Sequence, residues 1–156
     1  MLRKTFQAGE VIFEQGAYAN TMYEIAEGSV GIFADHGTPS ERQLATLEPG
    51  AFFGEMGLVE CYPRSATAVA LTNGTVVCEI DASEFASFYQ DQPHKVLEIM
   101  RQLSERLRTT NERYLEACRT VYGAIEAERA GAKPTASVVR GLSAMLKRFR
   151  PTRTQG

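Results

Sequence analysis

The first eighty residues of this chain are interrupted by glycine every few positions, which leaves room for short extended segments only. The glycines are Gly9, Gly16, Gly28, Gly31, Gly37, Gly50, Gly54, Gly57 and Gly74. Between them lie runs of strand-forming residues: Val11–Phe13, Met22–Ala26, Val30–Ala34, Gln43–Leu47, Thr67–Leu71 and Thr75–Ile80. Many short strands separated by turn residues predict a small antiparallel sandwich or barrel.

Two of the intervening turns have a recognisable chemistry. Asn73 and Gly74 form a two-residue pair that is typical of a tight β-hairpin, so we expect the strands on either side of it to pair with each other. The polar segment from His36 to Glu41 predicts a solvated loop at the tip of another hairpin.

The periodicity of the chain changes from strand to helix at Asp81. Asp81 is a candidate N-cap and Glu84 follows three residues later, as in a capping box, so residues 81–91 are expected to form a short helix. Pro93 then suits the first turn of a much longer helix that runs to about residue 130. Residues at alternating spacings of three and four form a seam on this helix: Met100, Leu103, Leu107, Thr110, Tyr114, Ala117, Val121 and Ala124. The seam favours pairing with a second copy of the chain, and packing against the β-rich body is the alternative.

Composition excludes several classes of protein. Hydrophobic residues make up 44% and charged residues 23% of the 156 residues, which is ordinary for a soluble globular protein. We find no apolar run long enough for a membrane span and no secretory signal, and the three cysteines form no CxxC pair or disulfide framework. A cytoplasmic protein is therefore expected. The histidines His36 and His94 lack the partners of a metal site, so we expect no metal.

Charge is distributed unevenly along the chain. The last 25 residues carry six basic side chains and no acidic one, whereas 11 basic and 19 acidic residues precede them. An acidic body argues against nucleic-acid binding by that body. We expect residues 131–156 to form a basic amphipathic tail, whose partner could be a protein, a membrane surface or nucleic acid, or which could be an ordinary solvated end.

The segment from Phe52 to Thr67 carries the most specific chemistry. It places the carboxylate of Glu55 and the guanidinium of Arg64 nine residues apart among glycines and small or apolar residues. Gly54 and Gly57 allow a close approach of the backbone to a bound group, and the planar guanidinium suits a phosphate. A carboxylate can only accept, as from a sugar hydroxyl. The pair predicts a site for a small ligand with a phosphate at one end and a ribose at the other. Neither a nucleophile with its base nor a second carboxylate accompanies Glu55, so we expect no enzyme activity and no cofactor.

Four motifs in order resemble the cyclic nucleotide-binding domain family. They are Phe6, Gly9, Ile12, Phe13 and Gly16; then Tyr23, Ile25, Gly28, Val30 and Ile32; then Leu47, Gly50, Phe53, Gly54 and Glu55; and finally Pro63 to Thr67. The resemblance implies a mainly β fold with helices: an antiparallel jelly-roll β-barrel over residues 1–80, a short helix at 81–91 and a long C-terminal helix at 93–130. It also implies a cassette that binds the cyclic phosphate.

The resemblance assigns roles to individual residues. Backbone groups of Gly54, Glu55, Met56 and Gly57, with those of Ser65 and Ala66, would hold the cyclic phosphate. Arg64 would neutralise its charge, and Glu55 would accept from the ribose 2′-hydroxyl. Val30 and Leu44 would line the wall behind the base. Thr110 and Asn111 align with the two hydroxyl-bearing positions that touch the purine in catabolite activator-like members, although Asn111 departs from that pattern.

The resemblance favours cAMP as the ligand over cGMP or a cyclic dinucleotide, because Ser65 after Arg64 is similar to cAMP-preferring members. The chain after residue 131 is too short for the helix-turn-helix module of family transcription factors, so we expect no DNA-binding domain. Output would then pass through a homodimer or through the basic tail. The alternative is a degenerate barrel that binds no nucleotide and acts as a dimerisation scaffold.

Overall fold

The computed structural model describes residues 2–18, 20–60, 62–131, 133 and 135–149, without the side chains of residues 86, 89 and 145–149. Its contacts divide the chain into two compact units, and the division falls between Gln102 and Leu103, inside the long helix. The first unit holds the β-strands, and the second holds most of the long helix together with a C-terminal helix.

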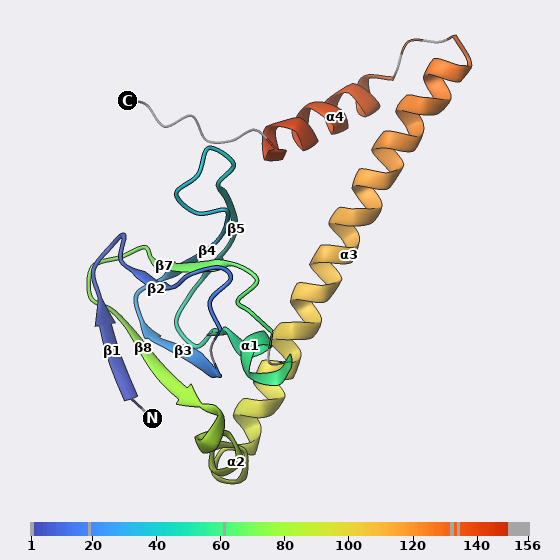
Figure 1. The fold of residues 1–156 in the computed structure, drawn as a ribbon. Coiled ribbons are helices and arrows are strands. Elements are labelled where there is room, and N and C mark those ends of the chain that lie inside the picture. The colour runs from blue at the N-terminus through green and yellow to red at the C-terminus, as the bar shows by residue number, and fades with distance from the viewer. Residues whose placement is uncertain (1, 19, 61, 132, 134, 150–156) are drawn as a thin grey trace. The chain divides into compact units, whose positions relative to one another are not determined.

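Eight strands of the first unit form two antiparallel four-stranded sheets. One sheet has the order β1 (Leu2–Phe6), β8 (Thr75–Asp81), β3 (Thr21–Glu27) and β6 (Phe52–Phe53). The other has the order β2 (Val11–Phe13), β7 (Thr67–Ala70), β4 (Val30–Ala34) and β5 (Arg42–Leu47). Figure 1 shows β1, β8 and β3 on one side and β2, β7 and β4 on the other. The predicted antiparallel jelly-roll fold with flanking helices and a long helix is confirmed.

A cluster of buried apolar side chains joins the two sheets. Its members are Tyr23, Ile25, Val30, Phe53, Ala68 and Val77. The rings of Phe13, Tyr23 and Phe53 stack on one another with centroids 5.3 to 5.8 Å apart. Such stacking adds a preferred geometry to the burial of apolar area. Phe53 of this stack directly precedes Gly54 in the chain, so the cassette begins next to the aromatic part of the core.

The hairpin expected at Asn73 and Gly74 is wrong. The strands on either side of this turn, β7 and β8, lie in different sheets, so the turn carries the chain across the sandwich. The φ of Gly74 is +74°, as a tight turn requires, but the buried hydroxyl of Thr75 donates to the carbonyl of Thr72 at 2.8 Å. The Asn73 side chain accepts from the backbone N–H of Ala8 at 3.0 Å. These contacts outside a two-stranded ladder redirect a turn whose local sequence is also suitable for a hairpin.

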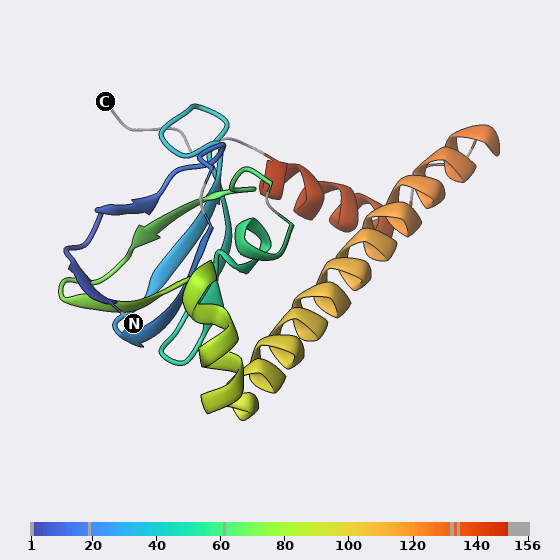
Figure 2. The ribbon, with the colours of Figure 1, turned by 60° about the horizontal axis from the view of Figure 1, so that its bottom comes forward.

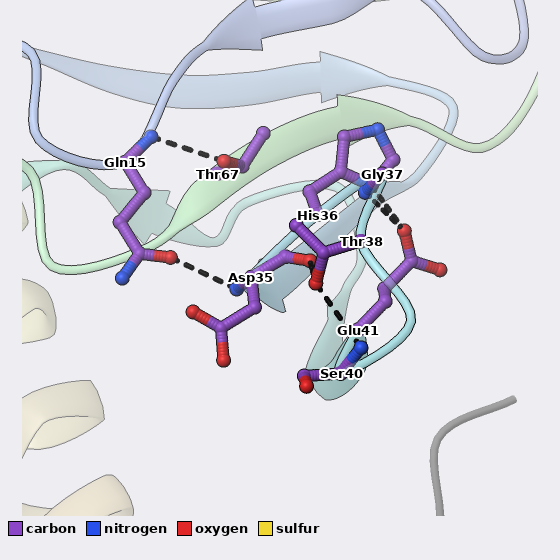
Figure 3. A network of polar contacts seen from close by, with 8 residues as sticks. All are labelled: Gln15, Asp35, His36, Gly37, Thr38, Ser40, Glu41 and Thr67. Carbon is purple, nitrogen blue, oxygen red and sulfur yellow. Dashed lines mark hydrogen bonds and ion pairs between the residues drawn. The ribbon is translucent and has the colours of Figure 1, made fainter.

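The polar loop expected at residues 36–41 does join two paired strands, β4 and β5. Figure 3 shows its internal contacts. His36 Nδ1 lies 2.8 Å from Glu41 Oε2, and the same carboxylate accepts from the N–H of Gly37 at 2.7 Å. Asp35 adopts a φ of +53°, and its N–H donates to the side chain of Gln15. The loop is therefore held by its own polar groups and by the side chain of Gln15.

Three helical segments complete the first unit: α1 (Glu55–Glu60), α2 (Ala82–Asp91) and the start of α3 (Pro93–Arg129). Figure 2 shows α2 following directly on β8. The predicted capping box is present at α2, where Asp81 caps the helix. The backbone N–H and the hydroxyl of Ser83 both donate to the Asp81 carboxylate at 2.8 Å, and these bonds, the backbone one first, lower its pKa.

A second apolar cluster attaches these helices to the β3–β8 side of the barrel. It contains the buried side chains of Met22, Phe52, Ile80, Phe88 and Ile99. Phe88 comes from α2 and Ile99 from α3, so both helices share one patch of the sheet with the short strand β6.

The second unit is a pair of helices, the part of α3 from Leu103 onward and α4 (Ala136–Phe149). Two glycines let them approach closely. A Cβ on Gly123 would lie 3.0 Å from Val138, and one on Gly141 would lie 2.8 Å from Thr120. Glycines at such crossings remove the side chain that would hold the helices apart. The C-terminal segment is therefore helical over its described part and packs on the end of α3.

Candidate functional site

The cassette begins at a backbone conformation that requires glycine. Gly54 has a φ of +76°, and a Cβ at this position would lie 2.8 Å from Arg64 Nη1. Helix α1 starts at the next residue, Glu55, whose side chain is buried with 7% exposed. The turn at Gly54 thus brings the first carboxylate of α1 and the guanidinium of Arg64 to the same end of the barrel.

Arg64 is buried, with 4% of its surface exposed, and the structure fixes its head from several sides. Nη1 donates to the Gly54 carbonyl at 2.5 Å and Nη2 donates to the Thr21 hydroxyl at 3.0 Å. The guanidinium carbon lies 4.3 Å from the centroid of the Phe13 ring, a cation–π distance. Nε is buried and has no hydrogen-bond partner within the described part of the chain. A planar cation whose Nε–H is still unused is suited to an anionic group.

The charge state of Arg64 is also suited to binding an anion. Burial lowers the pKa of the Arg64 guanidinium, because desolvation disfavours the charged form, while Tyr23 and Glu55 oppose that shift. The pKa of arginine is so high that the side chain stays charged at neutral pH. The site therefore contains a permanent positive charge that is partly removed from water and lies within electrostatic reach of the Glu55 carboxylate.

The remaining cassette residues lie close to this pair. The exposed hydroxyl of Ser65 lies 3.8 Å from the sulfur of Met56, which joins the two arms of the cassette, and Met56 is about half exposed. Gly57 is buried inside α1, and Ala66 is buried just before β7. The structure thus brings together residues 54–57 and 64–66, the two segments that the sequence predicts to hold a phosphate.

The other predicted site residues are placed differently. Val30 is completely buried in the core cluster, whereas Leu44 on β5 is 49% exposed, so these two side chains do not share one surface. Thr110 and Asn111 belong to the second unit and are exposed on α3, where the Thr110 hydroxyl donates to the carbonyl of Arg106 at 2.8 Å.

Sequence reasoning missed the residues that support the site. Thr21 accepts from Arg64, and Phe13 lies under the guanidinium, but neither is adjacent to the cassette in the sequence. The sequence offered no local signal for either contact, because the cation–π pair of Phe13 and Arg64 is formed only by the fold.

A separate hollow of about 490 Å³ is lined by Val11, Glu14, Gln15, Asp35, His36 and Thr67. As Figure 3 shows for several of these residues, their polar groups bond to one another.

Among the described residues no cluster of histidine, cysteine and carboxylate groups could hold a metal ion. In the same part of the chain, no helix has the length and apolar character needed to cross a membrane.

The fold and the cassette together define the class of protein. Residues 3–92 match the family model described as "Cyclic nucleotide-binding domain", and the chain belongs to this family.

Individual relatives agree with this assignment. The cyclic AMP receptor protein of Thermus thermophilus is 44% identical over 69 residues, which cover 44% of this chain and 32% of that protein. The crystal structure of the Thermus thermophilus catabolite activator protein matches 94% of this chain and 78% of that one, with a TM-score of 0.63 and 27% identity. A structure described with the words "A cyclic-GMP-dependent signalling pathway regulates bacterial phytopathogenesis" matches 69% of this chain and 84% of that one, with a TM-score of 0.54 and 27% identity. The chain thus spans about a third of the length of the first of these relatives.

Proposed function

We propose that this chain is a non-catalytic regulatory module that senses a cyclic nucleotide, with cAMP as the preferred ligand. The observation that carries the proposal is the buried guanidinium of Arg64, which lies beside Gly54 and whose Nε has no hydrogen-bond partner within the described residues. A buried cation without a full set of partners is costly unless a ligand or another group completes it. The cyclic phosphate supplies that group.

Each residue of the cassette has a role in this proposal. Backbone N–H groups of residues 54–57 and of Ser65 and Ala66 donate to the phosphate, and Arg64 neutralises it. The Glu55 carboxylate accepts from the ribose 2′-hydroxyl, a charge-assisted bond of about 1.5–3 kcal/mol. Leu44, whose side chain is exposed, offers an apolar contact to the base. Thr110 and Asn111 are the candidate base contacts on α3.

The choice of cAMP rests on Ser65 and on a relative. The Thermus thermophilus protein that shares 44% identity over 69 residues is named a cyclic AMP receptor protein. The structure associated with a cyclic-GMP-dependent pathway shares 27% identity with this chain, the same as the Thermus thermophilus catabolite activator protein structure, so identity does not rank them and cGMP is the second candidate.

Calorimetric titration with cAMP and cGMP tests the proposal. We expect micromolar or tighter binding of cAMP by the wild type and a loss of about a hundredfold in Arg64→Ala, since one to two charge-assisted bonds are lost. Arg101→Ala is the matched control, because Arg101 is exposed and pairs with Glu98 on the same helix. No heat from the wild type with either nucleotide up to millimolar concentration would refute the proposal.

Assembly belongs to the same proposal. Large apolar side chains of the predicted seam are exposed on α3 within the second unit: Leu103, Leu107, Tyr114 and Val121 are 39–68% exposed. An exposed apolar row of this length on a helix suits a second copy of the same helix. We propose a homodimer through α3, which transmits ligand binding to its partner or to the basic C-terminal tail. The tail would contact a protein or a membrane surface. The side chains of residues 145–149 and all of residues 150–156 lie outside the described part of the chain.

The exposed row on α3 also favours a second candidate function. A barrel that no longer binds nucleotide could serve as a dimerisation scaffold. A thermal-shift screen separates the two, because a ligand that binds only the folded protein raises its melting temperature by mass action. The scaffold predicts an unchanged melting temperature with cAMP and cGMP, together with dimers that do not depend on either.

A further inference from the structure

The first ten residues of α3 are fixed to the barrel by two polar contacts as well as by apolar packing. The Lys95 ammonium lies 2.8 and 2.6 Å from the two oxygens of Glu24 on β3. Seven residues later, the amide of Gln102 bonds to backbone on both sides of Ala51. Its Oε1 accepts from the N–H of Phe52 at 3.0 Å, and its Nε2 donates to the carbonyl of Gly50 at 3.1 Å.

These two contacts reach the same point of the sheet. Glu24 on β3 and Phe52 on β6 are directly opposite each other in the antiparallel pairing. Lys95 and Gln102 are two helical turns apart, so they lie on one face of α3 about 10 Å apart along its axis. A helix held at two points of one face cannot rotate about its axis or slide along it without breaking a contact. We use the name α3 clamp for the four residues Glu24, Phe52, Lys95 and Gln102.

The α3 clamp fixes the orientation of α3 on the sheet, which the apolar packing between them does not. Phe52 and Ile99 belong to the apolar cluster between the sheet and the helices, and burial of apolar area does not select one orientation. The ion pair is only partly exposed, with 26% of the Lys95 side chain and 18% of the Glu24 side chain accessible. Hydrogen bonds and ion pairs have narrow distance and angle requirements, so they select one helix position.

The α3 clamp is connected to the cassette through the backbone, because Phe52 lies two residues before Gly54. Phe52 is followed by Phe53 and then by Gly54, whose carbonyl accepts from Arg64. Any displacement of Gly54 or Arg64 that accompanies phosphate binding therefore reaches the Phe52 backbone through two peptide units. From there the Gln102 side chain passes it to α3, which continues for 27 residues after Gln102.

We infer that Gln102, supported by the Lys95–Glu24 pair, is the positioning residue that couples the cassette to the long helix. This inference rests on the proposed function and adds to it the route by which a bound ligand changes the helix. Gln102 does not touch the ligand in this scheme. It links two elements whose relative position the ligand biases, which is the physical requirement for coupling between sites.

The test separates coupling from a merely structural role. Gln102→Met keeps the length of the side chain and removes its hydrogen bonds, and Arg101→Met on the neighbouring exposed position is the matched control. Hydrogen exchange is measured over residues 93–102 and at the Phe52 amide, with and without saturating cAMP, and the affinity for cAMP is measured by calorimetry.

We expect cAMP to change exchange over residues 93–102 in the wild type and in Arg101→Met. In Gln102→Met the cAMP-dependent change is lost, while the affinity stays within about fivefold of the wild type. Without cAMP, the Phe52 amide of Gln102→Met exchanges about tenfold faster. If Gln102→Met does not fold, Gln102→Glu replaces it, since the carboxylate still accepts from Phe52 but cannot donate to Gly50.

The outcomes have distinct meanings. A wild type that binds cAMP, together with a Gln102→Met variant whose α3 exchange responds to cAMP as the wild type does, overturns the inference and leaves the proposed function intact. A wild type that binds neither cAMP nor cGMP overturns both. A loss of affinity larger than about a hundredfold in Gln102→Met also overturns the inference, because the residue would then act on the site itself.

Discussion

Replacing Gly54 by alanine isolates the contact on which the candidate site depends. The new Cβ would lie 2.8 Å from Arg64 Nη1 and 3.3 Å from a ring carbon of Phe13. The φ of +76° is also unfavourable for an alanine. Two separate costs therefore act at one position, backbone strain and displacement of the guanidinium.

A second glycine separates these two costs. Gly74 has almost the same φ, +74°, but a Cβ there would meet no atom within 4 Å. Gly74→Ala should lose about 1–2 kcal/mol of unfolding free energy from strain alone. Gly54→Ala should lose the same amount plus about 1.5–3 kcal/mol, because Arg64 must leave its hydrogen bond to the Gly54 carbonyl.

Urea unfolding and calorimetry with cAMP measure both effects. We expect Gly54→Ala to be less stable than Gly74→Ala by at least about 1.5 kcal/mol, and to bind cAMP at least about tenfold more weakly. Equal stabilities and equal affinities in the two variants would show that the position of Arg64 beside Gly54 is unimportant, and the reasoning about the site would be refuted.

Three further predictions concern other parts of the chain. The hydrogen bonds to the Asp81 carboxylate lower its pKa, so they stabilise the fold at pH values above the unfolded pKa of about 3.9. This stabilisation is lost as the pH falls through the pKa of the folded state, so the urea midpoints of wild type and Asp81→Ala should converge in acid. A gap between the two midpoints that stays constant with pH would contradict this. Gly141→Val should speed hydrogen exchange in α4, because the new side chain forces α4 away from α3. Ser143→Val, at an exposed position, should leave the exchange unchanged. Equal exchange rates in the two variants would show that Gly141 is not the point of close approach between α3 and α4. Leu107→Glu should convert a dimer to a monomer in sedimentation equilibrium. Leu115→Glu, which is exposed but outside the seam, should leave the dimer intact. A dimer that survives Leu107→Glu would show that the seam is not the dimer interface.

Much of the fold follows from local patterns in the sequence. Val11–Phe13 and Val30–Ala34 are strands with the predicted bounds, and the capping box marks the start of α2 at Ala82. These features depend on residue type and short-range spacing. The two-residue strand β6 was not predicted, because two phenylalanines are too few to show a period.

The errors concern interactions that join distant parts of the chain. Asn73 and Gly74 determine a turn, but only the pairing of β7 with β4 and of β8 with β3 decides that the turn crosses between sheets. Glu24 lies on β3 between the buried residues Tyr23 and Ile25, and its partner Lys95 lies 71 residues away. No local pattern links two such residues.

The candidate site was predictable from the sequence only where its residues lie close together in the chain. Glu55, Glu60 and Arg64 are the charged residues of a segment that is otherwise largely apolar and glycine-rich, and the structure buries Glu55 and Arg64 but exposes Glu60. Their supports were not predictable from spacing, because Thr21 lies on β3, 43 residues before Arg64 in the sequence.

The burial of Arg64 affects how its presence in homologous chains should be interpreted. The residue contacts Phe13, Thr21 and the Gly54 carbonyl, so it contributes to the barrel as well as to the proposed phosphate site. Selection for a stable barrel therefore acts on this arginine in addition to selection for ligand binding. Ser65 is exposed and supports the barrel much less, so its retention across orthologues would be the better record of selection for ligand recognition.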